Sequence, residues 1–413
     1  MADVARARPV APSHGPVAWM RANLFNTPSN AIITLVVVAA LVWVLPKLFA
    51  WAITDAVWEI NSAKCRTASG ACWGFVAEKY RLMLFGTYPY AEQWRPLVVS
   101  IALVAMVVAT LNTRLWGRLL WGAWLIALPV LFHLMQGGSI ELVMVILAAL
   151  GGAVIVGLPT SLVMPAGLGA LGLLFLYWAL SGLLGLPPLP ALPGLFSYVE
   201  TEKWGGLPLT LILATVGIVC SFPLAVLLAL GRRSDLPGIK ALCIGFIELV
   251  RGVPLITVLF MASLMIPLFL PEGVNFDKLL RAQIGITLFS AAYVAEVIRG
   301  GLQAIPKGQY EAADALGLSY GYKTAFVVLP QALKLVIPPL VNTFIGLFKD
   351  TSLVIIIGLF DFLGSIRLAS NDPEWRAFYV EGLVFAGLVY FVFCYAMALY
   401  SRNLEKRLNT GHR

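Results

Sequence analysis

Long apolar runs alternate with short polar segments along most of the chain. Crossing a bilayer as a helix takes about 20 apolar residues, and some runs here qualify only with small polar interruptions. We therefore predict membrane-spanning helices over eight runs, at residues 32–53, 97–111, 119–135, 208–230, 241–270, 279–298, 333–360 and 383–399. Because a long polar stretch, residues 1–30, precedes the first run, we expect no cleavable signal peptide.

The number of spans in one region, residues 139–185, is ambiguous from the sequence. The region is apolar throughout but is interrupted by glycine and proline. If spans alternate, the chain is outside at Gln136 and outside again before Pro208, so the region holds two spans or none. We predict two, over about residues 140–158 and 166–184, for ten spans in total. The alternative is eight spans, with this region forming a re-entrant hairpin packed against protein.

Composition supports an all-α polytopic membrane protein. Hydrophobic residues make up 60% of the 413 residues and charged residues only 12%, and the mean hydropathy is +0.87. A soluble domain carries about 25% charged residues. The net charge of +8 could indicate a nucleic-acid partner, but the basic residues fall between spans in a pattern typical of cytoplasmic loops. We therefore expect a lipid bilayer and no nucleic acid as partner, with both termini cytoplasmic.

The chain divides into two halves of different character. Residues 1–205 hold the early spans, an outer segment at about residues 54–95 and a proline-rich link. Residues 206–405 form a compact five-span unit, and residues 406–413 form a cytoplasmic tail. Cys65 and Cys72 lie in the outer segment, where the compartment is oxidising, so a disulfide between them is one possibility and two free thiols the other.

The most specific motif lies in the loop between the spans at 279–298 and 333–360. It reads Glu311-Ala312-Ala313, then three residues that begin with Asp314, then Gly317, then nine residues, and then a V-x-L-P run that ends at Pro330. The alanines remove side-chain bulk, so a partner backbone can approach closely, and glycine tolerates the positive φ of a sharp turn. These features favour a loop that docks on a partner protein. The alternative is an ordinary amphipathic helix that lies on the membrane surface.

This spacing resembles the EAA loop of the permeases of bacterial ABC importers, a loop at about residues 303–330 here. In that family the loop leaves the membrane and docks as a coupling helix on an ATPase subunit. Two E-apolar-apolar-R-G sequences, at Glu248 and Glu296, and the F-K-D-T-S sequence at 348–352 are similar to the branch that imports polar amino acids such as histidine and glutamine. The long N-terminal half resembles the general L-amino-acid permeases of the AapM/BztC kind.

The resemblance implies a multi-pass permease of the bacterial inner membrane that works by alternating access. Its implied partners are a homologous second permease subunit in a heterodimer, two ATPase subunits and a periplasmic amino-acid-binding protein. This chain has no G-x-x-x-x-G-K-[ST] phosphate loop, so ATP and Mg²⁺ would bind the ATPase subunits, and we expect no cofactor in this chain. Its three histidines are isolated, and we expect neither a catalytic set nor a metal site.

Charged residues inside spans are costly and need a reason. The candidates are Glu248, Arg251, Glu296, Arg299, Lys349 and Asp350, with Thr351 beside them. Each glutamate of the E-x-x-R sequences lies one helical turn from its arginine, so local neutralisation is one interpretation. The other is that these side chains line the substrate path. Two other functional classes also remain: an ion-coupled secondary amino-acid transporter, and a non-transporting membrane receptor or scaffold.

Overall fold

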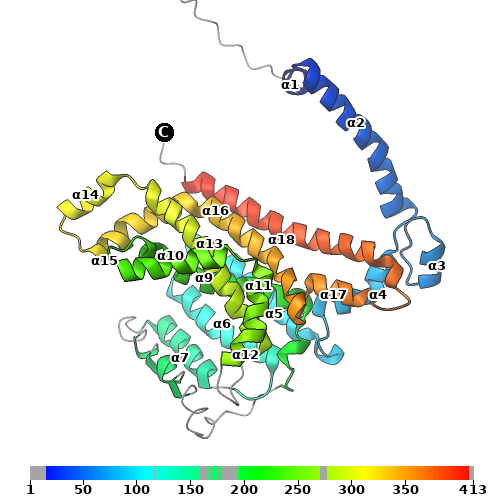
Figure 1. The fold of residues 1–413 in the computed structure, drawn as a ribbon. Helices are drawn as coiled ribbons and strands as arrows, with labels where there is room; N and C mark the ends of the chain where they lie inside the picture. The colour runs from blue at the N-terminus through cyan, green and yellow to red at the C-terminus, as the bar shows by residue number, and fades with distance from the viewer. Residues whose placement is uncertain are drawn as a thin grey trace, which may run out of the picture. The chain divides into compact units, whose positions relative to one another are not determined.

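The computed structural model describes residues 15–115, 117–140, 142–157, 196–269 and 277–408, together with 165–167, 169–174, 176–177 and 194. The chain forms two compact units, residues 1–77 and 78–413, and each is described by itself. Almost all regular structure is helical (Figure 1). In the described residues the strand structure is limited to β1 (Phe360–Asp361) and a few isolated bridges. The all-α fold class predicted from the sequence is confirmed.

The first unit contains one long apolar helix. Helix α1 (Pro16–Asn23) leads into α2 (Pro28–Phe49), which a π-helical turn extends to Thr54. The Thr27 side chain caps α2 by accepting a hydrogen bond from the Asn30 amide. None of the α2 residues is buried, so its apolar side chains are free to meet lipid or another protein chain. Helix α3 (Ser62–Thr67) and the first turn of α4 (Trp73–Phe85) complete the unit.

The second unit holds the other helices. The early ones are α5 (Trp94–Leu111), α6 (Arg118–Gln136) and α7 (Leu142–Val156). The next are α9 (Gly206–Arg232), α10 (Pro237–Arg251), α11 (Leu255–Phe260), α12 (Ile266–Phe269) and α13 (Lys278–Ala304). After them come α14 (Lys307–Ala315), α15 (Tyr320–Tyr322), α16 (Leu329–Asp350), α17 (Phe362–Ala369) and α18 (Tyr379–Leu408).

Seven helical segments in the described residues are long and apolar enough to cross a membrane. An eighth is present if α10 and α11–α12 together form one span, bent by 105° where Gly252 and Pro254 interrupt the helix. Every one of the eight runs predicted first thus corresponds to a helix or a bent helix pair. The last residue of the run predicted at 241–270 lies outside the described residues.

The two extra spans predicted in residues 139–185 are only partly described. Helix α7 packs along α6 (Figure 1), and the pairing is close because Gly122 and Gly151 face one another across it. A Cβ at Gly157, just after α7, would come within 2.2 Å of the Arg118 guanidinium at the start of α6. Helix α7 therefore runs back along the whole of α6, as a crossing segment would. Most of the second extra span, 166–184, and the proline-rich link lie outside the described residues, so the total of ten stays a prediction.

The chain returns to its departure point after this region. Gly138 donates a backbone hydrogen bond of 2.9 Å to Phe196, and Val199 donates one of 2.7 Å to Gln136. Both ends of the intervening segment thus lie at the same place. This agrees with the requirement that the segment contain an even number of crossings.

The core of the second unit is built from α9, α13 and α16 (Figure 1). Small residues let these helices approach closely, as in other membrane bundles. A Cβ at Gly301 of α13 would lie 2.7 Å from the Ala332 carbonyl of α16, so these two helices are in backbone contact there. One apolar cluster, around Leu209, Leu213 and Ile286, fills one end of the bundle. A second, which includes Ile298 and Ala332, fills the end from which α14 and α15 project. The predicted domain boundary at residue 205 remains a prediction.

Candidate coupling loop and charge cluster

The EAA sequence forms a helix outside the bundle. Glu311, Ala312, Ala313 and Asp314 all lie in α14, whose first residue follows Pro306. Ala313 is buried, at 2% exposure, whereas its neighbours Glu311 and Ala312 are exposed. Helix α14 therefore rests on the protein through an alanine and presents its acidic residues and its other alanines outward.

A left-handed glycine ends this helix. Gly317 has φ +70°, a conformation that costs other residues about 1–2 kcal/mol, and no atom lies within 4 Å of the position where a Cβ would stand. The Leu318 amide donates to the Ala313 carbonyl and the Gly317 amide to the Asp314 carbonyl, as in a Schellman cap. The chain then turns into α15, and Lys323 pairs with Asp314 at 2.6 Å across the turn. Pro330 is the second residue of α16, which continues directly from a π-helical stretch, Lys323–Val328.

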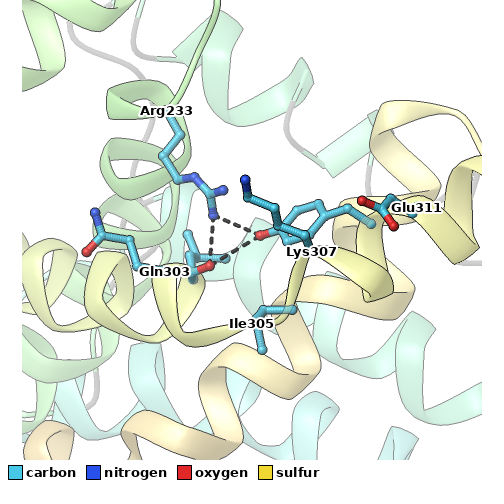
Figure 2. A pocket seen from close by; sticks show the side chains of 7 residues that line it. Arg233, Gln303, Ile305, Lys307 and Glu311 are labelled. Atoms are coloured by element: carbon cyan, nitrogen blue, oxygen red, sulfur yellow. Dashed lines mark hydrogen bonds between the residues drawn. The ribbon is translucent and has the colours of Figure 1, made fainter.

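Arg233 and Tyr310 connect α14 to the bundle, and Figure 2 shows Arg233 with its hydrogen bonds. The Arg233 Nη1 donates to the Tyr310 hydroxyl at 2.9 Å and to the Leu302 carbonyl at 3.1 Å. The Tyr310 hydroxyl lies 3.2 Å from the same carbonyl and donates to it. The end of α9, the end of α13 and the coupling helix thus meet in one hydrogen-bonded triad. An open cavity of about 470 Å³ lies beside it.

Four of the charged candidates gather in a second cluster. Glu296 of α13 is its centre: it accepts a 2.9 Å hydrogen bond from Arg299 Nε, and it lies 3.3 Å from Arg232 and 3.8 Å from Arg251. Glu248 joins through Arg232, at 2.9 Å. This ion-pair network connects the ends of α9, α10 and α13.

The local neutralisation expected within each E-x-x-R sequence is correct for only one of them. Glu296 pairs with Arg299 one turn later. Glu248 pairs instead with Arg232, and Arg251 pairs with Glu296, because α10 and α9 bring these side chains together across helices. Arg232 and Arg233 are among the basic residues between spans, which the sequence pattern marks only as topology signals. The signal that could have found them is their position directly after a span, facing two helix ends that carry glutamate.

Lys349, Asp350 and Thr351 lie elsewhere in the bundle, at the far end of α16. Lys349 is 17 residues beyond Ala332, which packs against Gly301 near the Glu296 network. At 1.5 Å per residue this separation is about 26 Å. Thr351 is buried and donates to the Phe348 carbonyl at 2.9 Å. Among the described residues, neither Lys349 nor Asp350 has an ion-pair partner.

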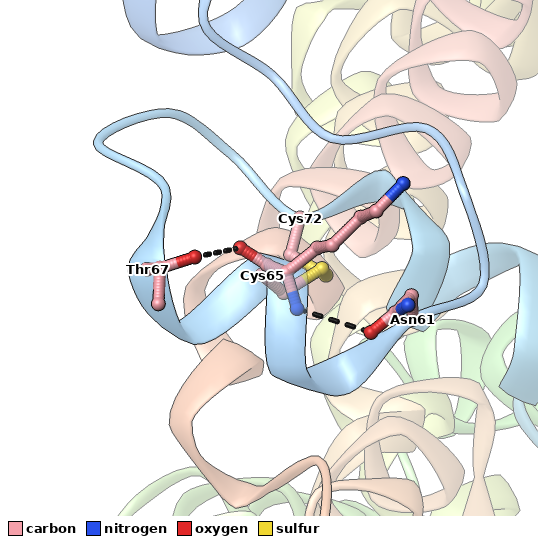
Figure 3. Close-up of a disulfide and its surroundings, with 5 residues drawn as sticks. Asn61, Cys65, Thr67 and Cys72 are labelled. Atoms are coloured by element: carbon pink, nitrogen blue, oxygen red, sulfur yellow. Dashed lines mark hydrogen bonds between the residues drawn. A yellow bond between two sulfur atoms is a disulfide. The ribbon is translucent and has the colours of Figure 1, made fainter.

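Cys65 and Cys72 are joined by a disulfide, with their Cα atoms 5.4 Å apart (Figure 3). Both are buried in the first unit, in the segment that the sequence predicts to lie outside. Helix α3, which carries Cys65, is capped by Asn61, whose side chain accepts from the Lys64 amide at 3.0 Å. Within the described ranges, no group of three or more histidine, cysteine, aspartate or glutamate side chains is placed to hold a metal ion.

Comparison with known proteins identifies the family. Residues 221–410 match the model of the inner membrane component of binding-protein-dependent transport systems. The chain is 43% identical to the inner membrane amino-acid ABC transporter permease protein YhdY of Escherichia coli, over 96% of this chain and 94% of that protein. The chain belongs to the permeases of binding-protein-dependent ABC transporters. It is also 42% identical to the glutamate/glutamine/aspartate/asparagine transport system permease protein BztC of Rhodobacter capsulatus, over 97% of this chain and 95% of that protein.

A solved structure covers about half of the chain. The crystal structure of an amino acid ABC transporter with histidines is 30% identical, with a TM-score of 0.44, and covers 49% of this chain and 92% of its own. As a member of this permease family, the chain is a multi-pass inner-membrane subunit of a transporter whose ATPase activity resides in a separate subunit. The family membership sets aside the ion-coupled secondary transporter and the non-transporting receptor or scaffold.

Proposed function

We propose that this permease imports polar L-amino acids and that residues 303–330 couple its spans to the ATPase subunits. The substrate class is supported by the relatives: YhdY is named as an amino-acid permease, and BztC as a permease for glutamate, glutamine, aspartate and asparagine. Both relatives match this chain over nearly its full length, so the similarity includes the N-terminal half.

The observation that carries the coupling proposal is the exposed apolar surface around Gly317. Leu316 is 79% exposed, Tyr320 65% and Phe326 72%. They lie on the connection between α14 and α16, next to the acidic and alanine surface of α14. A contiguous apolar surface with a polar rim is typical of a protein-binding site. A groove on an ATPase subunit would cover it, with Glu311, Ala312 and Asp314 in the contact and Ala313 packed on the bundle beneath them.

The complete transporter then contains further chains. We propose a homologous second permease subunit, two ATPase subunits that bind ATP and Mg²⁺, and a periplasmic binding protein that delivers the amino acid. The basic loops, including Arg232 and Arg233, favour cytoplasmic placement of α14 and of both termini. ATP-driven closure of the ATPases would move α14, and the spans would reopen to the other side.

The substrate path is proposed separately from the coupling loop. Lys349 and Asp350 are supported as path residues because each lacks an ion-pair partner in the described residues, and a passing amino acid offers both a carboxylate and an ammonium group. Glu248, Arg251, Glu296 and Arg299 pair with one another and with Arg232. Their pairing favours a structural role at the cytoplasmic end over direct contact with substrate.

The test uses the transporter reconstituted with its ATPase subunits and binding protein. ATP turnover should rise when the binding protein carries a polar L-amino acid. Gly317→Val, a β-branched residue at a positive φ, should abolish that rise while the complex stays assembled. Gly317→Asn is the matched control, because asparagine tolerates the left-handed conformation. Absence of stimulation by every L-amino acid would refute the substrate class, and wild-type behaviour of the valine variant would refute the coupling role.

A further inference from the structure

One face of α16 is polar and exposed, although most of the helix is apolar. Positions 331, 342 and 349 are 11 and 7 residues apart, so on a helix of 3.6 residues per turn they lie within about 20° of one line. This line runs the length of α16, from the end that contacts the coupling helix to the end that carries Thr351. The exposed residues on this side of the helix include Gln331, Leu335, Pro339, Asn342 and Lys349.

Asn342 is the residue of this face that most needs a partner. It lies near the middle of α16, it is exposed, and its side-chain amide forms no hydrogen bond within the part of the chain that the structure describes. The next residue, Thr343, differs, because its hydroxyl donates to the Pro339 carbonyl at 3.0 Å. A polar group placed among lipid tails without a hydrogen-bond partner is costly. Asn342 therefore faces water or a polar molecule in the assembled transporter.

Two prolines add hydrogen-bond acceptors to the same face. Pro338 and Pro339 are consecutive inside α16, and neither has an N–H. The carbonyls of Lys334 and Leu335, four residues earlier, therefore lack the helical donor that they would otherwise have. Both residues are exposed, and their carbonyls lie about one turn from Asn342, toward the coupling helix.

Lys349 supplies a cation on the other side of Asn342. It is exposed, and it has no ion-pair partner among the described residues. It lies two turns, about 10 Å, from Asn342 along the axis, and helical side chains lean toward the N-terminus, so the Lys349 side chain leans toward Asn342. Between them, Gly346 has no atom within 4 Å of the position where a Cβ would stand. The surface from Lys349 to Asn342 is therefore open.

We propose that this face of α16 lines the substrate path and that Asn342 determines which polar side chains pass along it. The inference rests on the proposed function, in which Lys349 is a path residue. Lys349 would attract the carboxylate of an incoming amino acid, and the carbonyls of Lys334 and Leu335 would accept from its ammonium group further along. Because about 20 Å separates Lys349 from Leu335 along the axis, these groups act in succession, and Asn342 lies between them.

An amide suits the middle position because it both donates and accepts hydrogen bonds. The Asn342 NH₂ can donate to a side-chain carboxylate or to the carbonyl of a side-chain amide, and its oxygen can accept from an amide NH₂. Acidic and amide side chains therefore both satisfy it. An aliphatic side chain would leave it unpaired.

Selectivity of transport tests the role of Asn342. Asn342→Asp keeps the size but leaves only acceptors, which can still bind a side-chain amide and repel a side-chain carboxylate. Uptake of L-glutamate and of L-glutamine would be measured in proteoliposomes that hold the complete transporter and ATP, with saturating loaded binding protein, at about pH 8 so that the new carboxyl is ionised. We expect the glutamate-to-glutamine ratio of uptake rates to fall about tenfold relative to wild type.

The matched control makes the same change elsewhere. Asn371→Asp alters an exposed asparagine just after α17 and should leave the ratio at its wild-type value. An unchanged ratio in Asn342→Asp, or an equal change in both variants, would overturn the assignment.

Contact with water tests this face without transport. Asn342→Cys and Leu227→Cys would each be made in a chain whose free cysteines, Cys220, Cys243 and Cys394, are replaced by serine. Leu227 is the control because it is an apolar residue of α9 that is 67% exposed. A charged methanethiosulfonate should label the cysteine at 342 about tenfold faster or more, because a thiol in apolar surroundings is not activated. Equally slow labelling of both, with and without ATP, would overturn the path along α16.

The two measurements separate this inference from the proposed function. If the wild type takes up no L-amino acid, the proposed function fails, and the labelling rates still decide whether the α16 face meets water. If uptake occurs but both Asn342 variants behave as their controls, the proposed function stands and the assignment of Asn342 is wrong. Loss of the second permease subunit from the purified Asn342→Asp complex would place Asn342 in a subunit contact and would also overturn the assignment.

Discussion

The Tyr310 hydroxyl lies 2.9 Å from the guanidinium of Arg233 and shares the Leu302 carbonyl with it. Tyr310 immediately precedes Glu311 in the coupling helix, and Arg233 immediately follows the α9 span. A movement of α14 can therefore be transmitted directly to α9 and α13 through this triad. The alternative route, through α15 and α16, is longer.

Removing this hydroxyl should weaken coupling more than assembly. Tyr310→Phe keeps the ring but loses both hydrogen bonds, each of which contributes about 0.5–1.5 kcal/mol. We expect stimulated ATP turnover to fall about two- to tenfold, while the amount of ATPase that co-purifies stays the same. Tyr322→Phe is the control, because Tyr322 is exposed on the same loop and stacks on Phe326 through its ring alone. An equal loss in both variants would show that the triad has no special role.

Replacing the centre of the charge cluster should destabilise the bundle. Glu296→Gln leaves Arg232, Arg251 and Arg299 around a neutral amide at a site where the Glu296 side chain is only 22% exposed. We expect a loss of about 1–3 kcal/mol in stability, measured as a lower unfolding temperature of the purified complex. Glu248→Gln should cost less, at most about 1 kcal/mol, because Glu248 is 55% exposed and holds one arginine. A larger loss of stability in Glu248→Gln than in Glu296→Gln would show that Glu248 contributes more to the network than Glu296.

The outer disulfide should resist labelling until it is reduced. Cys65 and Cys72 close a short loop, and a cross-link over about eight residues contributes about 2–3 kcal/mol in the chain-entropy model. Maleimide labelling of unfolded protein, read by mass spectrometry, should modify Cys220, Cys243 and Cys394 before reduction and all five cysteines after it. Labelling of Cys65 without a reductant would show that the pair is not oxidised in the cell.

One outer contact should depend on pH. The Lys79 ammonium donates to Asp372 at 2.7 Å and lowers the pKa of that carboxyl below its ordinary value of 3.8. A carboxyl with a lowered pKa stabilises the fold above its unfolded pKa, and the contribution disappears as pH falls through the folded pKa. The unfolding temperature of wild type should therefore exceed that of Asp372→Asn slightly at neutral pH and converge with it in acid. A difference that stays constant as the pH is lowered into the acid range would exclude this ionisation as the cause.

Sequence alone predicted what is local or periodic in this fold. The apolar runs gave the spans, and the spacing from Glu311 to Pro330 gave a helix, a glycine turn and the start of α16. These features depend on a residue and its near neighbours, so a pattern is sufficient to find them.

The remaining features depend on contacts between distant residues. Arg232 meets Glu248 and Glu296, which are 16 and 64 residues away, and no spacing rule links them. The pairing of Arg233 with Tyr310 spans 77 residues. The expected Glu248–Arg251 pair was wrong because α9 offers Glu248 a better-placed cation. A rule based on spacing within one helix cannot account for a competing cation on another helix.

The backbone bonds that join Gln136 to Val199 and Gly138 to Phe196 make the segment between them a closed excursion. Both ends of the segment are held at the same place, so the position at which α9 begins does not depend on the length of the segment. A shorter or longer segment between the same anchors would leave the threading of α9 and every later helix unchanged. This segment can therefore differ between transporters, or be exchanged by design, without a change in the packing of the remaining helices.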